Sequence, residues 1–275
     1  MQTMLELITE ARVIRNQEIA ADIYKMVLLA PKAARAAQPG QFVSLYTKAS
    51  HRLLPRPVSL CRISGETITL VYGVVGAGTR EFSRLKAGEP LRLSMPQGNG
   101  FDLNYNKPPI GLIGMGNNEQ DRHTGRRLVT LVGGGLGVPP LLELAAALIA
   151  QGDEVQAILG FRQKPFLLSE MAELGIQSHV ATDSGSQGFH GTVMDFILAN
   201  PLKSDVVYAC GPKGMLRSLS THCQGITMPL QVSVEERMGC GYGACLGCVC
   251  KTRSGYKKVC TDGPVFSGED VDWDA

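Results

Sequence analysis

The sequence changes its pattern near Arg127, and this change constrains the fold more than any other feature. Before Arg127, short runs such as residues 66–73 alternate between polar and apolar side chains, with glycine and proline between the runs. Several short alternating strands at close intervals predict a small antiparallel barrel. After Arg127, continuous apolar strands are each followed by a helical stretch, as in residues 128–150. This alternation predicts a parallel sheet with right-handed crossovers.

These two patterns and a cysteine-rich end divide the 275 residues into four parts. We expect the fold class β + α/β, with a short barrel helix over residues 80–88 that Gly88 ends. The expected parts are an antiparallel β-barrel at 1–104, a linker or insertion at 105–127, a parallel-sheet α/β domain at 128–235 and a small cysteine-rich segment at 236–275.

The composition argues against several classes of function. A net charge of +2 is too small to predict binding to nucleic acid or to an anionic surface. No apolar run reaches the roughly 18 residues that a membrane span requires, and the N-terminal stretch lacks the pattern of a signal peptide. We therefore expect a cytoplasmic protein without nucleic-acid or membrane partners. Eight cysteines in that compartment predict metal or redox chemistry rather than structural disulfides.

A glycine-rich loop separates the first apolar strand of the second half from a helix that Pro139 and Pro140 open. Glycines at such a position let backbone N–H groups approach a pyrophosphate, and the helix dipole favours the anion. The spacing differs from GxGxxG, so this is not the ordinary dehydrogenase fingerprint. The alternative is a tight strand–helix turn. The residues expected to bind a nucleotide here are Gly133, Gly134, Gly135 and Gly137.

A second nucleotide signal is the run Cys210, Gly211 and Pro212, which stands at the carboxyl end of a predicted strand. Ligands of open α/β sheets bind at that edge. Cys210 is therefore expected next to the ligand crevice. The alternative for this residue is a small buried side chain, which is the usual state of a free cysteine.

Three cysteines near the end of the chain have a diagnostic spacing. Cys240, Cys245 and Cys248 reproduce the x₄ and x₂ gaps of a plant-type 2Fe–2S loop. Interspersed glycines let the backbone wrap closely and direct its N–H groups at the sulfurs. The fourth ligand is either Cys250 or Cys260. We expect Cys260, because a predicted hairpin returns it to the loop, whereas Cys250 is only two residues from Cys248.

Other interpretations of the cysteines are open. A zinc ribbon is the main alternative, but it needs two close CxxC-type knuckles and the chain offers one. A disulfide knot is a further alternative. The predicted hairpin has its turn at Ser254 and Gly255. Cys61 and Cys223 have no partner in the pattern, and we expect them to be structural.

The run Arg56–Ser59, the glycine-rich loop and the Cys-Gly-Pro run stand in an order that resembles the ferredoxin–NADP reductase superfamily. The resemblance implies FAD on the barrel and a nicotinamide nucleotide on the α/β domain. Arg56, at the end of a barrel strand, can present a planar fork of donors to a pyrophosphate. Residues 76–79, before the first helix, can bind its other side. The expected FAD-binding residues are Arg56, Pro57, Val58, Ser59, Val71, Tyr72, Gly73, Gly78 and Thr79.

Two neighbouring arginines are not included in this set. Arg52 and Arg62 lack support from a motif, and we expect them to be surface charges.

The cysteine-rich segment narrows the resemblance further. Residues 235–252, EERMGCGYGACLGCVCKT, are similar to the cluster segment of the electron-transfer subunits of dihydroorotate dehydrogenase B. The stretches RPVSLC, LVGGGLGVPPLLELA and CGPKGML extend the resemblance over nearly the whole chain. Residues 105–127 depart from it, because the family passes almost directly from the barrel into the first α/β strand.

The resemblance implies an oxidoreductase subunit that holds FAD and a 2Fe–2S cluster. Its catalytic partner carries FMN and oxidises dihydroorotate in pyrimidine (UMP) biosynthesis. Electrons are expected to pass from FMN through the cluster and FAD to NAD⁺, in a heterotetramer with two copies of each subunit. Cys210 is expected to lie near the nicotinamide ring and to help position it. The expected cluster ligands are Cys240, Cys245, Cys248 and Cys260.

The choice of nucleotide depends on charge at the strand ends. Asp183 suits a ribose 2′-hydroxyl, whereas Arg162 and Lys164 could bind the 2′-phosphate of NADP. We expect NAD. The residues expected to bind it are Gly133, Gly134, Gly135, Gly137, Asp183, Cys210, Gly211 and Pro212.

Two other functions are kept as alternatives. One is an NAD(P)H-dependent flavin and iron–sulfur reductase subunit that feeds an oxygenase, a hydrogenase-type complex or a ferredoxin. The other is a zinc-containing regulator that binds a nucleotide. The cysteine-rich segment of about forty residues is too short to fold independently without metal, which favours the dihydroorotate system over reductases with a separate ferredoxin-like domain.

Overall fold

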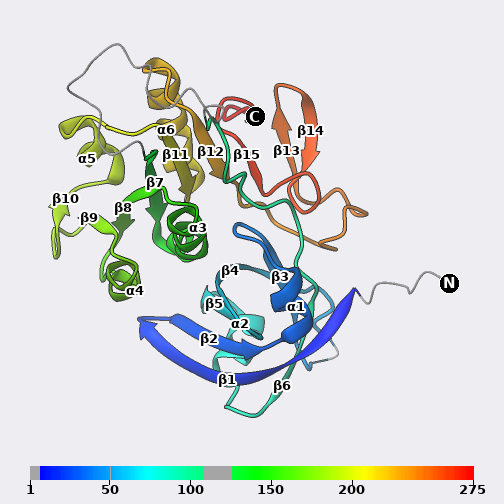
Figure 1. The fold of residues 1–275 in the computed structure, drawn as a ribbon. Helices are drawn as coiled ribbons and strands as arrows, with labels where there is room; N and C mark the ends of the chain where they lie inside the picture. The colour runs from blue at the N-terminus through cyan, green and yellow to red at the C-terminus, as the bar shows by residue number, and fades with distance from the viewer. Residues whose placement is uncertain (1–6, 50, 108–125) are drawn as a thin grey trace.

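The computed structural model describes residues 7–49, 51–107 and 126–275 (Figure 1). A barrel from the first part of the chain lies against an α/β sheet from the second, and the last forty residues lie beside both. The expected linker at 105–127 falls largely outside the described residues. Its two described ends are joined by Arg127, whose guanidinium donates to the carbonyl of Tyr105 at 3.0 Å.

The barrel is closed by six antiparallel strands in the order β1-β2-β5-β4-β3-β6. Side chains alternate along β5 as its sequence predicts: Leu70 packs inside the barrel and Val71 packs toward the α/β domain. The barrel elements are β1 (Ile8–Ala20), β2 (Ile23–Leu29), α1 (Pro31–Ala36), β3 (Phe42–Tyr46), β4 (Arg56–Ser64), β5 (Thr67–Gly73), α2 (Ala77–Ser83) and β6 (Pro90–Ser94).

Two details of the barrel differ from the sequence-based expectation. Arg56 begins β4 instead of ending a strand, because it pairs with Leu45 of β3. Helix α2 begins at Ala77 rather than at residue 80, and α1 precedes it. The early start follows from capping: the hydroxyl of Thr79 accepts hydrogen bonds from the N–H groups of Val75 and Gly76.

The second half forms a seven-stranded sheet in the order β10-β9-β8-β7-β11-β12-β15, in which only β15 is antiparallel to its neighbour. Its strands are β7 (Leu128–Gly134), β8 (Glu154–Phe161), β9 (Gln177–Thr182), β10 (Phe189–His190), β11 (Val206–Cys210), β12 (Leu230–Ser233) and β15 (Val265–Ser267). Its helices are η1 (Gly135–Gly137), α3 (Val138–Ala150), α4 (Leu168–Glu173), α5 (Val193–Ala199) and α6 (Lys213–Gly225).

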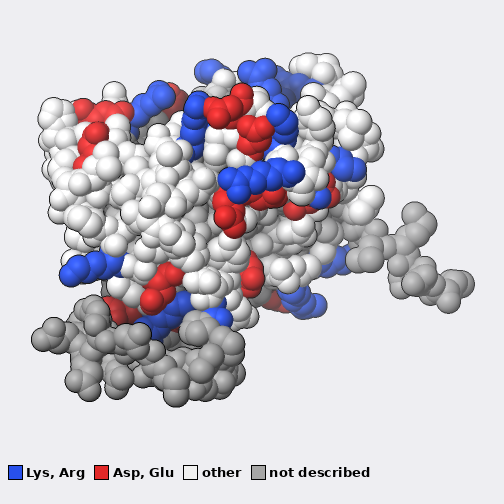
Figure 2. All heavy atoms as spheres, turned by 90° about the horizontal axis from the view of Figure 1, so that it is seen from above, with Lys and Arg blue, Asp and Glu red and all other residues white. Residues whose placement is uncertain are grey.

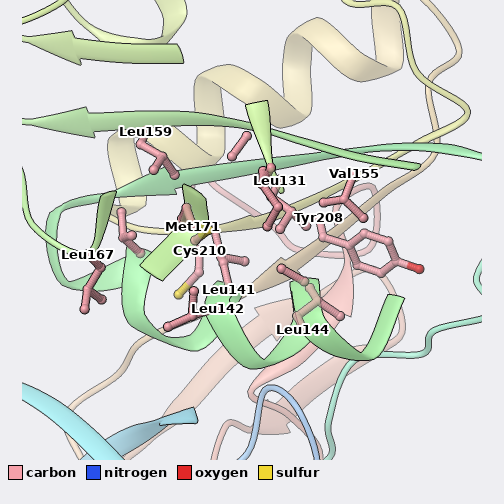
Figure 3. Close-up of a cluster of buried hydrophobic side chains, with 14 of the residues drawn as sticks. Leu131, Leu141, Leu142, Leu144, Val155, Leu159, Leu167, Met171, Tyr208 and Cys210 are labelled. Atoms are coloured by element: carbon pink, nitrogen blue, oxygen red, sulfur yellow. The ribbon is translucent and has the colours of Figure 1, made fainter. Parts of the chain in front are cut away.

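The two faces of the sheet are covered by different helices. Helices α3 and α4 pack on the face toward the barrel, and α5 and α6 pack on the other. The apolar face of α3 is the one that the sequence predicts: Leu141 and Leu144 (Figure 3) are fully buried, and so is Leu148. Burial of this stripe joins the sheet to the barrel, because α3 also packs on β4.

Ion pairs reinforce the boundary between barrel and sheet. Arg62 of β4 pairs with Glu143 of α3 at 3.3 Å, and Lys25 of β2 pairs with Glu170 of α4 at 2.6 Å. The expectation that Arg62 is a surface charge is therefore wrong. Arg52 is also paired, with Glu81 of α2 at 2.6 Å. Both arginines hold elements together, which a motif search does not reveal.

The cysteine-rich segment joins the sheet instead of forming a separate body. A hairpin of β13 (Val249–Thr252) and β14 (Gly255–Lys258) has its turn at residues 253–254, one residue before the expected place. The chain then enters β15, which pairs with β12. In the described part of the chain, no helix has the length and apolar character needed to cross a membrane. Figure 2 shows acidic and basic side chains interspersed on the face viewed.

Candidate functional site

The four cysteines expected to bind a cluster come together as two pairs. Cys240 hydrogen-bonds Cys245, and Cys248 hydrogen-bonds Cys260. Among the described residues, no three His, Cys, Asp or Glu side chains are placed to hold a single metal ion. A 2Fe–2S cluster takes two protein ligands on each of two irons. Two cysteine pairs match this requirement.

Backbone N–H groups point at these sulfurs. Those of Tyr242 and Gly243 donate to the Sγ atoms of Cys240 and Cys260, at 3.3 and 3.2 Å. Hydrogen bonding, first from the N–H of Tyr242, lowers the pKa of Cys240 to about 6, whereas burial raises the pKa of Cys260 to about 11. The donors stabilise negative charge on sulfur, and the thiolate is the form that binds metal.

Glycines give this loop its shape. Gly241 and Gly243 have φ values of 78° and 77°, in the left-handed region that favours glycine. A Cβ atom on Gly239 would lie 3.1 Å from the Sγ of Cys245. The loop is thus built to bring backbone close to sulfur, as the sequence predicts.

Cys250 belongs to neither cysteine pair. It lies in β13 opposite Lys257, and burial raises its pKa to about 11. It lines a different cavity, of about 380 Å³, together with Trp273 and Lys213. Cys260 stays the predicted fourth ligand, and Cys250 lies outside both cysteine pairs.

A buried polar network attaches the cysteine loop to the barrel. Gln97 donates from Nε2 to the carbonyl of Gly241 at 2.8 Å. Its Oε1 accepts from the hydroxyls of Ser44 and Ser94 at 2.7 and 3.0 Å. Asn99 adds hydrogen bonds to two carbonyls just after the fourth cysteine. The loop is thus fixed relative to β3, which pairs with the strand that begins at residue 56.

Two of the residues expected to bind FAD, Arg56 and Gly78, lie in contact on the barrel. The guanidinium of Arg56 lies directly over Gly78, where a Cβ atom would be 2.1 Å from Nε. Gly78 is in the first turn of α2, whose leading N–H groups have no intrahelical acceptor. An arginine fork and free N–H groups at one place can bind a diphosphate from two sides.

Not every residue in the expected FAD set faces outward. Val58 and Tyr72 pack inside the barrel, and the hydroxyl of Tyr72 donates to Asn16. Only their backbones are available to a ligand on the outer surface. Gly73 is placed differently: a Cβ atom there would lie 3.2 Å from a methyl group of Leu136. The end of β5 therefore borders the glycine-rich loop of the α/β domain.

The glycine-rich loop borders a cavity of about 770 Å³ at the carboxyl edge of the sheet. Its size is that of a pocket for a ligand as large as a dinucleotide, and its position matches the ligand crevice of open α/β sheets. Six expected nucleotide-binding residues line it: Gly134, Gly135, Gly137, Asp183, Gly211 and Pro212. Arg162 and Lys164, the residues considered for NADP, line it as well.

Two expected residues lie behind this cavity. Gly133 allows α3 to pack closely, because a Cβ atom there would be 2.9 Å from Val138. Cys210 is fully buried in the apolar cluster of Figure 3, and burial raises its pKa. Its carbonyl oxygen would be 2.2 Å from a Cβ atom on Gly137. These residues shape the loop from beneath, and the structure gives Cys210 no exposed sulfur.

Sequence reasoning missed some of the residues that line the cavity. Thr192 caps α5 and Glu235 follows β12; both lie at the same edge of the sheet. Ala20 and Ile23, from the β1–β2 hairpin, close the cavity from the barrel side. The position of Glu235 could have been inferred from the sequence, since it follows an apolar strand at the carboxyl edge. The position of the β1–β2 hairpin at the cavity could not, because it depends on how the barrel packs against the α/β domain.

Comparisons with known proteins agree with this geometry. The chain is 42% identical over 267 residues to the dihydroorotate dehydrogenase B (NAD(+)) electron transfer subunit of Geobacillus sp. (strain WCH70), covering 94% of this chain and 96% of that protein. It is 41% identical over 271 residues to the subunit of the same name from Bacillus caldolyticus, with coverage of 95% and 98%.

The chain belongs to the family of dihydroorotate dehydrogenase B electron transfer subunits.

A family profile described as the iron–sulfur cluster binding domain of dihydroorotate dehydrogenase B matches residues 235–272. Among solved structures, this family member resembles an NADH-dependent reduced ferredoxin-NADP oxidoreductase that was studied for flavin-based electron bifurcation. The TM-score is 0.80 and the identity 28%, with 96% of this chain and 90% of that chain covered. The fold alone is shared with the flavohemoglobin of Malassezia yamatoensis, at 20% identity and a TM-score of 0.63, with 81% and 57% covered.

These findings confirm the fold class and the family expected from the sequence. They also confirm the expected role as an electron-transfer oxidoreductase subunit and the cofactor set of FAD, a 2Fe–2S cluster and NAD. The roles of single residues depend instead on the geometry described above.

Proposed function

We propose that this subunit carries electrons from an FMN-containing dihydroorotate dehydrogenase partner to NAD⁺. When bound, the cluster and FAD supply the conversion between single-electron transfer and hydride transfer. The chain supplies the two binding sites, their relative position and the nucleotide cavity. We place the protein in pyrimidine biosynthesis and in the cytoplasm, in an assembly of two subunits of each kind.

One observation carries this proposal: the cysteine loop is fixed to the barrel wall on which the FAD residues lie. The link runs from Gly241 through Gln97 to Ser44 of β3, and β3 pairs with the strand that Arg56 begins. A rigid connection holds two redox groups at a constant separation. Electron transfer depends steeply on that separation, so fixed placement suits a relay.

The assigned residues follow from this arrangement. Arg56 and the first turn of α2 hold the diphosphate of FAD, and the cavity beside the glycine-rich loop holds NAD(H). Asp183 accepts hydrogen bonds from a ribose diol at one end of the cavity. The cluster ligands are Cys240, Cys245, Cys248 and Cys260.

The surface around the cysteines supports docking of a partner. Cys245 is exposed, and Leu246 beside it is 63% exposed. Leu7 is 59% exposed, and its carbonyl accepts a hydrogen bond from the hydroxyl of Tyr242. Exposed apolar side chains next to a redox site are typical of an interface that brings a second redox centre close.

The test is a comparison of two activities in the purified complex. We expect Cys245→Ser to abolish dihydroorotate-dependent reduction of NAD⁺ but to spare oxidation of NADH by an artificial acceptor that takes electrons from FAD. Cys223→Ser, in a buried position of α6 far from the loop in sequence, is the control and should retain both activities. Loss of both activities in Cys245→Ser alone would indicate unfolding, and a wild-type complex that ignores dihydroorotate would overturn the proposal.

The nucleotide preference has its own test. We expect turnover with NADH to exceed turnover with NADPH, because the Asp183 carboxylate would face a 2′-phosphate with like charge. A preference for NADPH would overturn the assignment of Asp183 and would point to Arg162 and Lys164.

A further inference from the structure

Lys258 brings a positive charge to the cysteine loop. Its Nζ atom donates a hydrogen bond to the carbonyl oxygen of Gly243 at 3.2 Å, and its side chain is half-buried. Within the described part of the chain, no carboxylate forms an ion pair with this ammonium group. Lys251, on the other strand of the same hairpin, is instead paired with Asp272 at 2.8 Å. The charge of Lys258 is therefore uncompensated where it meets the loop.

The contact with Gly243 places Lys258 between the two cysteine pairs. The N–H of Gly243 donates to the Sγ atom of Cys260 at 3.2 Å. Its carbonyl, which accepts from Lys258, belongs to the peptide group whose N–H lies on Ala244 and hydrogen-bonds the sulfur of Cys240. The ammonium group thus binds a residue whose adjoining N–H groups reach one sulfur of each pair.

The backbone of Lys258 is also held in place. Lys258 ends β14, and its N–H donates to the Oδ2 atom of Asp262 at 2.7 Å. Its carbonyl oxygen accepts from the N–H groups of Thr261 and Asp262 at 3.1 and 2.7 Å. Cys260 lies inside this tight turn. Lys258 and Cys260 are therefore fixed relative to each other, and the Asp262 carboxylate bonds the backbone rather than the ammonium group.

A fixed positive charge at this place affects the two oxidation states of a cluster unequally. A 2Fe–2S group on four thiolates gains one electron on reduction, so the site becomes more negative by one charge. An ammonium group nearby attracts the reduced state more strongly than the oxidised state. Partial burial keeps water and salt from screening this attraction fully. The expected consequence is a higher reduction potential.

We propose that Lys258 raises the reduction potential of the cluster through its positive charge and so makes the site a better acceptor of electrons from the partner subunit. The proposal rests on the proposed function, since it requires Cys240, Cys245, Cys248 and Cys260 to hold the cluster. It assigns Lys258 no proton transfer and no bond to iron.

The experiment is a redox titration of the purified complex, loaded with FAD and cluster, in which electron paramagnetic resonance follows the 2Fe–2S signal. Lys258→Met removes the charge and the hydrogen bond, Lys258→Gln removes the charge but keeps a donor, and Lys258→Arg keeps both. We expect Met and Gln to lower the equilibrium constant for reduction about tenfold, which is about 59 mV for one electron. Arg should restore the wild-type potential.

The matched control is Lys257→Met, which removes the same charge from the neighbouring residue. Successive side chains of a strand point to opposite faces, and Cys250, which pairs with Lys257 across the hairpin, lines the separate 380 Å³ cavity. The control should keep a potential close to that of the wild type. Iron content and the shape of the resonance signal establish that each variant is folded and loaded.

Three results would overturn the inference. If Lys258→Met and Lys258→Gln keep the wild-type potential, Lys258 only holds the loop. If Met lowers the potential and Gln does not, the hydrogen bond acts and the charge does not. If Lys257→Met shifts the potential equally, net charge alone is responsible. A wild-type complex that ignores dihydroorotate would contradict the proposed function but leave this titration measurable, so the two failures are distinguishable.

Discussion

At the scale of single residues, geometry distinguishes the proposed cluster ligands from Cys250. Cys250 and Cys260 are both buried and close in sequence, and burial raises the pKa of each to about 11. Burial and pKa alone therefore do not distinguish the two cysteines. The difference is that Cys260 is in contact with Cys248 and receives a backbone N–H, whereas Cys250 lies in the hairpin strand.

This difference predicts opposite outcomes for two matched substitutions. Cys260→Ser should lose most of the bound iron and the 2Fe–2S signal in electron paramagnetic resonance. Cys250→Ser should retain both, with a small loss of stability from placing a hydroxyl in a buried site. Iron analysis and spectra of the two purified variants decide the matter, and loss of the cluster from Cys250→Ser but not Cys260→Ser would reverse the assignment.

Two glycines of the α/β domain differ in what they tolerate. Gly137→Ala would place a Cβ atom 2.2 Å from the carbonyl oxygen of Cys210, so we expect a loss of at least about 1–3 kcal/mol from overpacking and weaker NADH binding. Gly214→Ala, in α6 with no atom near the added Cβ, should instead stabilise by about 0.5–1 kcal/mol. Chemical unfolding curves measure both, and equal effects would refute the close contact.

Residue identity and spacing were sufficient to predict most of this chemistry. The cysteine spacing predicted a 2Fe–2S site, and the structure pairs the same four sulfurs. Sequence did not reveal that Tyr72 and Val58 turn into the barrel, because alternation gives two faces without saying which one meets a ligand. It also missed Glu235, although this residue follows an apolar strand at the carboxyl edge of the sheet.

At the scale of elements, the buried amide of Gln97 joins the cysteine loop to the barrel. We expect Gln97→Leu to cost about 1–3 kcal/mol for each buried partner left without a hydrogen bond, among them the hydroxyls of Ser44 and Ser94. Gln97→Glu keeps the acceptor and loses the donor to Gly241, so it should affect the loop more than the barrel. Unfolding curves, with the cluster's resonance spectrum as a local probe, measure the two effects.

That prediction has a clear opposite outcome. If Gln97→Glu alters neither the cluster spectrum nor its reduction potential, the hydrogen bond to Gly241 does not position the loop.

Elements such as α3 were predictable from sequence, because their apolar periodicity is local. The Gln97 network was not, since it joins residues 144 positions apart.

At the scale of the whole molecule, an ion pair between β2 and α4 links barrel and sheet and should make their association depend on pH. Burial acts to raise the pKa of Glu170, but hydrogen bonds led by that from Lys25 outweigh it and hold the pKa below its usual value. A carboxyl with a lowered pKa stabilises the fold above its unfolded pKa. That stabilisation is lost as the pH falls through the folded value.

Glu170→Gln should therefore lower stability by about 0.5–1 kcal/mol at neutral pH, and the difference from the wild type should shrink as the pH falls below about 4. Glu173→Gln, at the last residue of the same helix, is the control and should show no such trend. Unfolding free energies measured from pH 3 to 7 provide the test, and a constant difference across that range would contradict it.

The division of the chain into barrel and α/β domain could be predicted from sequence, because each half has its own periodicity. The joining of the last segment to the sheet could not, since β15 has only three residues and pairs antiparallel in an otherwise parallel sheet. So short a strand has no pattern of its own, and its pairing is decided by where the preceding hairpin leaves the chain.

Because β15 pairs with β12, the cysteine-rich segment also covers an edge of the sheet. A chain cut after residue 235 would leave β12 with a row of unpaired N–H and C=O groups, beside Val232 that is now fully buried. Open apolar edges of this kind recruit strands from other molecules. We expect such a fragment to self-associate through this edge, which the cysteine segment covers in the intact chain.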